Sequence, residues 1–115
     1  LGIAGIESKA ERITQFFIET VERLCGREVR LSSPHDAMLR GSHVCFAHPQ
    51  GYAVMQALIT RGVIGDFRPP ELMRFGFAPL YNSFEQAWRA ADALAGVLRS
   101  REWDQPKFLT RAKVT

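Results

Sequence analysis

One arginine within an alternating apolar segment is the residue of this chain best suited to chemistry. Apolar Met73, Phe75 and Phe77 recur at every second position, which is typical of a strand with one buried face. Arg74 then points out of the opposite face, and Gly76 leaves the approach to its guanidinium uncovered. A guanidinium is a planar fork of donors that binds a carboxylate through two parallel hydrogen bonds. By spacing alone, a solvated arginine on an open sheet face is the commoner interpretation.

Two more charged residues lie just upstream of this arginine. Asp66 and Arg68 are two positions apart in an expected strand, so their side chains share a face and are able to pair. From the spacing, we interpret them as an ion pair that organises the hairpin. Downstream, we interpret Tyr81 and Asn82 as an anchor for the turn and a helix cap.

The other polar side chains do not form a metal-binding or nucleophilic motif. No two of the three histidines have the i, i+4 spacing of a helical zinc site, and the two cysteines do not complete one. Ser42 and His43 are adjacent, so they point to opposite faces of a strand and do not form a triad. We therefore expect no metal. His35 and His48, each beside a proline, are expected in exposed loops.

Length and composition are those of an ordinary globular domain. The chain has 115 residues, a length sufficient to bury a hydrophobic core. Of these residues 46% are hydrophobic and 23% charged, which are ordinary values for a globular protein. The net charge of +3 is mild and the basic residues are scattered, which argues against nucleic-acid binding. No apolar run is long enough to cross a bilayer. Cys25 and Cys45 lie in apolar contexts and fit a reducing cytoplasm, and the opening at Leu1 suggests a segment of a longer protein.

The elements that must position Arg74 follow from hydrophobic periodicity. The first is a helix from Ser8 to Cys25, with an apolar stripe, capping-box spacing at its start and Gly26 just past its end. Shorter apolar segments predict a helix over 50–61 and strands at 28–32, 42–47, 63–67 and 72–77. We expect the last two of these strands to pair in antiparallel fashion.

The final helix has the clearest pattern. Ser83 to Gln86 again have capping-box spacing, and one face carries Phe84, Ala87, Trp88, Ala91, Leu94, Ala95 and Leu98. From Trp103 we expect a tail, frayed or docked elsewhere, with Pro106 preventing any continuation of the helix. The order of helices and strands predicts an α+β two-layer sandwich, an antiparallel sheet with helices on one face.

The segment from Arg74 to Phe84, R-F-G-F-A-P-L-Y-N-S-F, together with Arg40–Val44 and Arg61–Arg68, resembles the C-terminal part of kynureninases. These are pyridoxal-phosphate (PLP) enzymes of the aminotransferase-like superfamily, fold type I. The resemblance covers nearly the whole chain. It implies a single C-terminal small domain of a longer enzyme, with a linking helix at 1–26, an α+β core at 27–103 and a tail at 104–115.

The resemblance also implies a role for Arg74. In this family the arginine of the segment binds the α-carboxylate of the substrate, L-kynurenine or 3-hydroxykynurenine. L-kynurenine is hydrolysed to anthranilate and L-alanine in tryptophan degradation, a route to NAD. The resemblance to the wider PLP superfamily also implies that Asp66 and Arg68 lie at the edge of this site, with Asp66 orienting or screening the basic side chains. A cytoplasmic homodimer is implied as well.

No catalytic or PLP-binding residue is expected within this chain. Its lysines do not follow an apolar strand, and it has no glycine-rich phosphate cradle; they are Lys9, Lys107 and Lys113. The resemblance implies that the Schiff-base lysine and the phosphate contacts belong to a large domain upstream. We therefore predict that the chain alone is inactive.

Two alternatives stay open at this point. One is a stand-alone α+β module that binds a small ligand or RNA, supported by the layout and an isoelectric point of about 9.2; against it, the expected exposed faces lack base-stacking aromatic pairs. The other is a domain of a different PLP enzyme, such as a cysteine desulfurase-like or aminotransferase-like relative. The run P-L-Y-N-S-F after Arg74 and its neighbours favours kynureninase.

Overall fold

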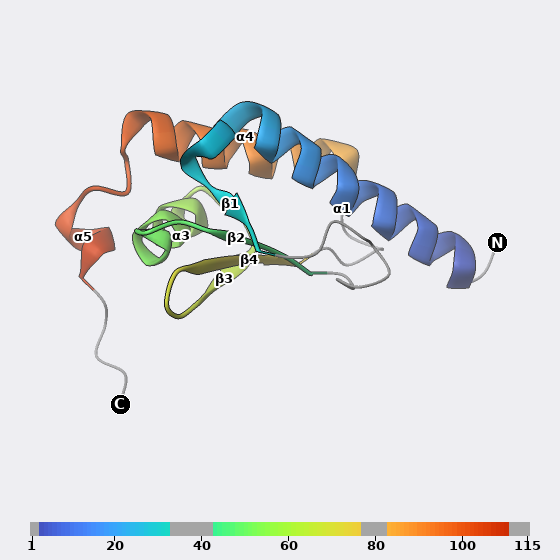
Figure 1. Cartoon of the computed structure of the whole chain (residues 1–115), viewed down its shortest axis with the longest axis horizontal. Helices are drawn as coiled ribbons and strands as arrows, with labels where there is room; N and C mark the ends of the chain where they lie inside the picture. Colours follow the sequence, from blue (N-terminus) through green and yellow to red (C-terminus); the bar gives the residue numbers. More distant parts are fainter. Residues whose placement is uncertain (1–2, 33–42, 77–82, 111–115) are drawn as a thin grey trace.

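The computed structural model describes residues 3–32, 43–76 and 83–110, with side chains from residue 11 onward. The elements in chain order are α1 (Ile3–Cys25), the 3₁₀ helix η1 (Gly26–Glu28), β1 (Arg30–Leu31), β2 (His43–Ala47), α3 (Gly51–Thr60), β3 (Gly65–Arg68), β4 (Leu72–Gly76), α4 (Phe84–Ser100) and α5 (Pro106–Leu109). Figure 1 shows the long helices α1 and α4 on one side of the sheet, while none of these helices covers its other side.

Helix α1 forms one wall of the core. Its apolar stripe faces the core between α4 and the sheet, and its buried members include Ile13, Phe17, Ile18 and Val21. The helix begins at Ile3, so the capping box expected at Ser8 is wrong, because Ser8 lies inside the helix. Gly26 has a φ of +59°, a left-handed conformation that favours glycine, which confirms it as the residue that ends the helix.

The strands form one antiparallel sheet in the order β1-β2-β4-β3. The expected pairing of the last two strands is confirmed, and β4 is also paired with β2 along its whole length. β3 starts at Gly65, two residues later than predicted. The delay arises because Val63 still donates its amide to Leu58 in the turn that closes α3.

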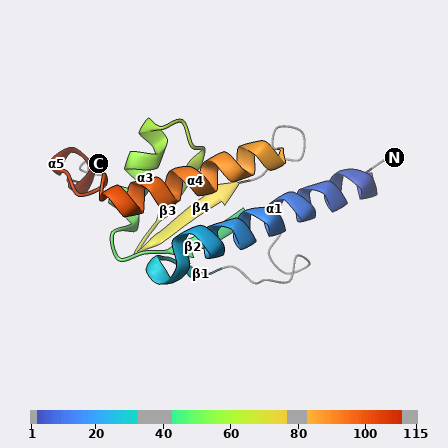
Figure 2. The same ribbon diagram turned by 90° about the horizontal axis from the view of Figure 1, so that it is seen from above.

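Helix α4 lies beside α1 over the sheet (Figure 2). The predicted capping box is present: Ser83 Oγ accepts from the Gln86 amide at 3.2 Å, and Gln86 Oε1 accepts from the Ser83 amide at 2.9 Å. Phe84 and Trp88 were expected on the buried face, but each is 44% exposed. They lie at the margin of the contact with α1, where Phe16 packs edge-on against Phe84.

The segment after α4 is more ordered than the predicted tail. Pro106 begins α5, because a proline at the first helical position needs no amide donor. Trp103 and Phe108 are buried, and α5 packs on α3. The Trp103 ring also meets His48 edge-on, so this histidine is half-buried and the expected exposed loop position is wrong. Burial lowers the pKa of His48.

The core lies between the helix layer and one face of the sheet. Phe17 of α1 meets Phe75 of β4 with ring centroids 5.1 Å apart and Phe46 of β2 at 6.1 Å. The predicted α+β two-layer sandwich, with helices on one face of an antiparallel sheet, is confirmed. Within the described ranges, no helix is both long and apolar enough to span a membrane.

Candidate functional site

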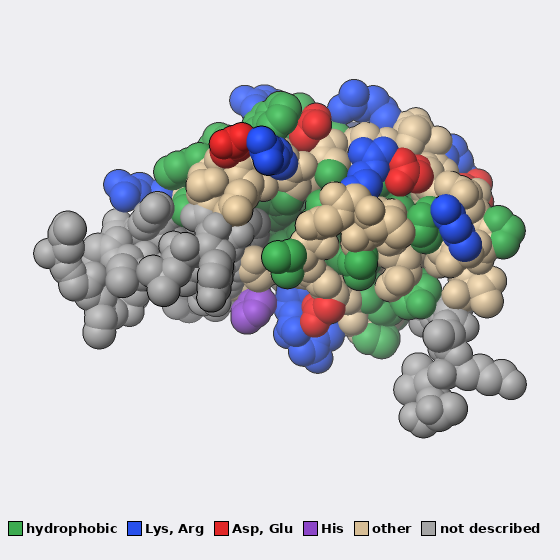
Figure 3. Space-filling view, turned by 180° about the vertical axis from the view of Figure 1, so that it is seen from behind, with side chains coloured by type: hydrophobic (Ala, Val, Ile, Leu, Met, Phe, Trp, Pro, Cys, Tyr) green, Lys and Arg blue, Asp and Glu red, His purple; other side chains and the backbone are tan. Residues whose placement is uncertain are grey.

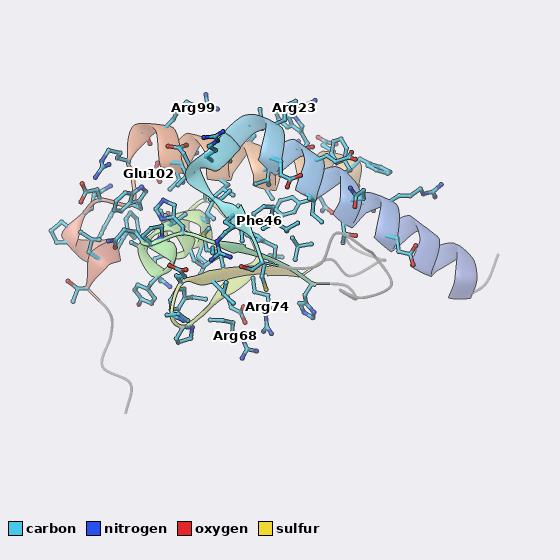
Figure 4. All side chains as sticks on the ribbon, viewed as in Figure 1. Arg23, Phe46, Arg68, Arg74, Arg99 and Glu102 are labelled. Atoms are coloured by element: carbon cyan, nitrogen blue, oxygen red, sulfur yellow. The ribbon has the colours of Figure 1, made fainter. Side chains whose placement is uncertain are left out.

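The sheet face turned away from the helices carries the candidate site. We call it the open face; by the strand register it comprises Arg30, His43, Cys45, Ala47, Asp66, Arg68, Leu72, Arg74 and Gly76. Figure 4 shows Arg74 and Arg68 pointing away from the helices, whereas Phe46 lies on the helix side. In Figure 3, a small group of basic and acidic side chains lies at the lower side of the molecule beside a histidine, while other charged side chains are spread over its upper part. The prediction that Arg74 leaves the sheet opposite its apolar neighbours is confirmed.

Arg74 sits on the most constrained strand of the sheet. β4 is hydrogen-bonded on both sides, with Cys45 of β2 and Asp66 of β3 directly opposite Arg74. Met73 and Phe75 on either side of it in sequence are fully buried, so the strand cannot rotate without exposing them. The backbone beneath the guanidinium is therefore held firmly, and the side chain itself is 29% exposed.

The guanidinium of Arg74 already binds a carboxylate. Its Nε donates to Asp66 Oδ1 at 2.9 Å and its Nη2 donates to Asp66 Oδ2 at 2.6 Å, a two-bond fork. These hydrogen bonds from Arg74 to Asp66 raise the pKa of the arginine above its ordinary value, so it stays cationic at every relevant pH. The arrangement shows that the fork lies in the open, in a geometry suited to a carboxylate.

The surroundings of Gly76 differ slightly from the sequence prediction. A Cβ at Gly76 would lie 3.5 Å from Cδ2 and 3.6 Å from Nε2 of His43, so the imidazole borders the space that the missing side chain leaves. These are ordinary contact distances. His43 is exposed and faces Gly76 across the β2–β4 pair. The approach to Arg74 is thus flanked by an imidazole rather than being fully uncovered.

The expected ion pair between Asp66 and Arg68 does not form. Both carboxylate oxygens of Asp66 accept from Arg74 on the neighbouring strand. Arg68 is exposed, and no ion pair to it exists within the described part of the chain. Tyr81 and Asn82 lie outside the described residues. The structure thus brings Arg74 and Asp66 together and leaves Arg68 nearby on the same face.

Sequence reasoning placed Asp66 near the basic side chains but did not predict its direct pairing with Arg74, although a signal was available. In a hairpin with a short turn, residues equidistant from the turn face each other. Counting outward from the three-residue connection Pro69-Pro70-Glu71 pairs position 68 with 72 and therefore 66 with 74, as the structure shows. Directly opposed residues have Cβ atoms about 4.5–5.5 Å apart, close enough for a carboxylate and a guanidinium to pair.

One cavity lies elsewhere, between α4 and the turn that follows α3. It has a volume of about 310 Å³ and is lined by Arg61, Ile64, Phe75, Arg89 and their neighbours, not by Arg74. Its two arginines are paired, Arg61 with Glu102 and Arg89 with Glu85. Arg74 is paired in the same way, so pairing alone does not separate the two places; the open face also carries Arg68, for which no ion pair exists within the described residues.

The chain is similar in sequence to known kynureninases. Residues 6–94 match the family described as "Kynureninase C-terminal domain". It is 48% identical to the kynureninase of Pseudomonas fluorescens over 114 residues, which cover 98% of this chain and 27% of the relative. It is 47% identical over 112 residues to kynureninases of Burkholderia mallei (strain SAVP1) and Burkholderia pseudomallei (strain K96243), covering 96% of this chain and 27% of each.

The chain therefore spans about a quarter of the length of these relatives. At this identity and coverage, and with the predicted fold confirmed, its family is established: the chain belongs to the kynureninase C-terminal domain family.

Proposed function

We propose that this chain is the domain of a kynureninase that binds the α-carboxylate of the substrate. The observation that supports this most directly is the Arg74 guanidinium, which stands on the open face and holds a carboxylate in a two-bond fork. A fork of this kind recognises planar carboxylates by shape as well as by charge. The proposed reaction is hydrolysis of L-kynurenine, or its 3-hydroxy form, with L-kynurenine giving anthranilate and L-alanine in tryptophan degradation.

The contribution of Arg74 to such a reaction is positioning. Two parallel hydrogen bonds fix both the location and the plane of the carboxylate, and so restrict rotation of the adjoining Cα. Holding a substrate in the reactive orientation lowers the entropic part of the barrier. Because β4 is paired on both sides, the fork is supported by the most rigid part of the sheet. No proton transfer by Arg74 is required.

PLP is the cofactor proposed for the whole enzyme, and the residues described here do not fit its covalent attachment. The lysine whose side chain the structure describes is Lys107, on the short helix α5, with its Nζ over the Phe108 ring. A Schiff-base lysine instead needs a position from which it reaches the cofactor held beside the substrate. We propose that PLP is bound by a large domain outside this chain and that the isolated chain is inactive.

The same proposal extends to the assembly. The open face would meet the large domain with the bound substrate between them, and the partly exposed Phe84 and Trp88 offer a second apolar contact. Within such an enzyme the chain would form one small domain, with 1–26 leading into it and 104–115 at its end; its hydrophobic core draws on α1 and Phe108 as well as on 27–103. A cytoplasmic homodimer is part of the proposal.

The test uses the natural protein that carries this chain, supplied with PLP. Anthranilate release from L-kynurenine is followed by fluorescence in the wild type, Arg74→Ala and Arg74→Lys. We expect a loss of about a hundredfold in kcat/KM in Arg74→Ala and little recovery in Arg74→Lys, since an ammonium does not reproduce the fork. A wild type without anthranilate release, or an Arg74→Ala variant of unchanged kcat/KM, would contradict the proposal.

A substrate analogue without the carboxylate separates binding of this group from general damage. The decarboxylated amine of kynurenine has nothing to bind to Arg74. We therefore expect its inhibition constant to be the same in the wild type and in Arg74→Ala. If Arg74→Ala weakened the binding of this amine as much as that of kynurenine, the arginine would have a structural role instead.

A further inference from the structure

A guanidinium has two edges that can each hold a carboxylate. The side edge consists of Nε and one Nη, and the end edge consists of the two Nη atoms. Asp66 occupies the side edge of Arg74, through Nε and Nη2. Within the described residues, no hydrogen bond or ion pair to Nη1 of Arg74 exists, so the end edge still has its donors to offer.

We propose that Asp66 is a positioning residue that holds Arg74 by its side edge and presents the end edge to the substrate carboxylate. This inference rests on the function proposed above for Arg74. It goes beyond that function by dividing the guanidinium between a fixed internal carboxylate and an exchangeable one from the substrate. The open face would then bind one α-carboxylate in one orientation.

The location of Asp66 supports positioning more than stabilisation of the fold. The backbones of β3 and β4 are already joined by the ladder that sets Asp66 opposite Arg74. Asp66 is 50% exposed, and ion pairs that are this open to water contribute little to folding. A free arginine side chain, in contrast, has many rotamers, and fixing it in advance spares the substrate that ordering cost.

The charge of Asp66 has a second consequence. The carboxylate neutralises most of the charge of Arg74, so a simple anion in solution is attracted only weakly. A substrate carboxylate still gains two directed hydrogen bonds at the end edge. Asp66 thus makes the site select for a planar carboxylate attached to a molecule with further contacts, and it lowers competition from small anions.

The test compares four variants of the natural protein with PLP: Asp66→Ala, Asp66→Asn, Arg74→Ala and Glu71→Gln. Glu71→Gln is the matched control. Glu71 pairs with Arg30 of the same sheet at 3.3 Å, and the substitution removes one negative charge, as Asp66→Asn does. We expect KM for L-kynurenine to rise about tenfold in Asp66→Ala, with kcat within about twofold of the wild type. The KM of Asp66→Asn should lie between those of the wild type and Asp66→Ala. Glu71→Gln should match the wild type in both KM and kcat.

Formate provides a readout that a purely structural role would not move. In Asp66→Ala, formate can occupy the vacated side edge, so low millimolar formate should lower KM toward the wild-type value before higher concentrations compete at the end edge. In the wild type, where Asp66 fills that edge, formate should act only as a weak competitive inhibitor. Melting temperatures, measured on the same samples, should agree within about 2 °C for the wild type and both Asp66 variants.

The outcomes separate the inference from the proposed function. If Arg74→Ala lost activity while both Asp66 variants kept the wild-type KM, the inference would be wrong and the role of Arg74 would stand. A raised KM that formate does not lower, or one accompanied by a large drop in melting temperature in both Asp66 variants, would also overturn it. An unchanged Arg74→Ala would overturn the proposed function itself.

Discussion

Two arginine–carboxylate pairs in this molecule have the same chemistry and different surroundings. Arg74 donates Nε and Nη2 to Asp66, and Arg61 donates Nε and Nη2 to Glu102. In each case the hydrogen bonds raise the pKa of the arginine. The guanidinium groups are similarly open, with side-chain exposures of 29% for Arg74 and 39% for Arg61.

The difference lies in what each pair connects. Arg74 and Asp66 stand on adjacent strands that backbone hydrogen bonds already join. Arg61 follows the end of α3, and Glu102 follows the end of α4, 41 positions away in sequence. A Cβ on Gly96 of α4 would lie 3.2 Å from Nη1 of Arg61, so the side chain also lies close against that helix. The second pair joins two elements, whereas the first adds little to a hairpin that is already closed.

The role of a two-bond ion pair therefore depends on whether its two elements are already joined by other contacts. Where the scaffold leaves two elements unjoined, the pair stabilises their arrangement. Where the scaffold is already fixed, the pair leaves the arginine oriented and available for a ligand. The predictions below test this contrast in order of decreasing expected effect.

The largest effect is expected on activity, and only for the pair on the open face. In the natural protein, Arg74→Ala should lower kcat/KM for L-kynurenine about a hundredfold while leaving the melting temperature unchanged. Arg61→Met, which keeps an unbranched stem about as far as Nε and removes the guanidinium, should lower the melting temperature and leave kcat/KM within about twofold. Steady-state kinetics and thermal melting of the same samples test this. Equal kinetic losses in both variants would refute the contrast.

A second prediction concerns the scaffold beneath the open-face pair. A Cβ at Gly65 would lie 2.7 Å from the carbonyl oxygen of Arg74 and 3.1 Å from Cε of Met55. Because the first contact is with backbone, β3 must shift, and we expect Gly65→Ala to destabilise the fold by about 1–3 kcal/mol. KM should rise too, since Asp66 moves with β3. Urea unfolding measures the loss.

Gly76→Ala is the matched control for that experiment. Its Cβ would meet the His43 ring at ordinary distances of 3.5–3.6 Å, so the free energy of unfolding should stay near that of the wild type. If Gly76→Ala were as destabilising as Gly65→Ala, the close approach at Gly65 would not be the cause.

A third prediction measures the coupling between Arg61 and Glu102. A double-mutant cycle with Arg61→Met and Glu102→Gln should give a coupling free energy of about 0.5–1 kcal/mol. This is the upper part of the range for ion pairs exposed to water. The pair of Arg89 and Glu85, four residues apart on the exposed face of α4, serves as the baseline. Its cycle should give about 0.3–0.5 kcal/mol. A coupling free energy no larger than this baseline would show that the Arg61–Glu102 pair does not stabilise the arrangement of α3 and α4.

The smallest effect is a pH dependence of stability. The hydrogen bonds from Arg61 hold the pKa of Glu102 below its ordinary value of 4.5. Since the folded pKa is lower than the unfolded one, the pair stabilises the fold above about pH 4.5 and this contribution is lost as pH falls through the folded pKa. Glu102→Gln should therefore be less stable than the wild type at pH 7, and the difference should shrink as the pH falls below about 4.5, as melting over a series of pH values would show.

Much of the fold could be predicted from hydrophobic periodicity. The stripe of α1, the alternation around Arg74 and the capping box at Ser83 each point to one local structure, and each is found. Local patterns failed where a tertiary contact competes with them. Phe84 and Trp88 follow the apolar period of α4, yet each stays 44% exposed, Phe84 with only an edge-on contact to Phe16 of α1. Pro106, a signal for interruption, instead begins a helix whose Phe108 is buried in the core cluster.

The sequence by itself determined that Arg74 leaves the sheet on the face opposite Met73 and Phe75, because successive side chains of a strand alternate. Only the tertiary structure decided the partner of this arginine. Asp66 had a candidate two positions along its own strand, about 6.6 Å away at 3.3 Å per residue, and another directly across the ladder at about 5 Å. The shorter separation lets Arg74 reach both carboxylate oxygens, and it exists only once β3 and β4 have paired.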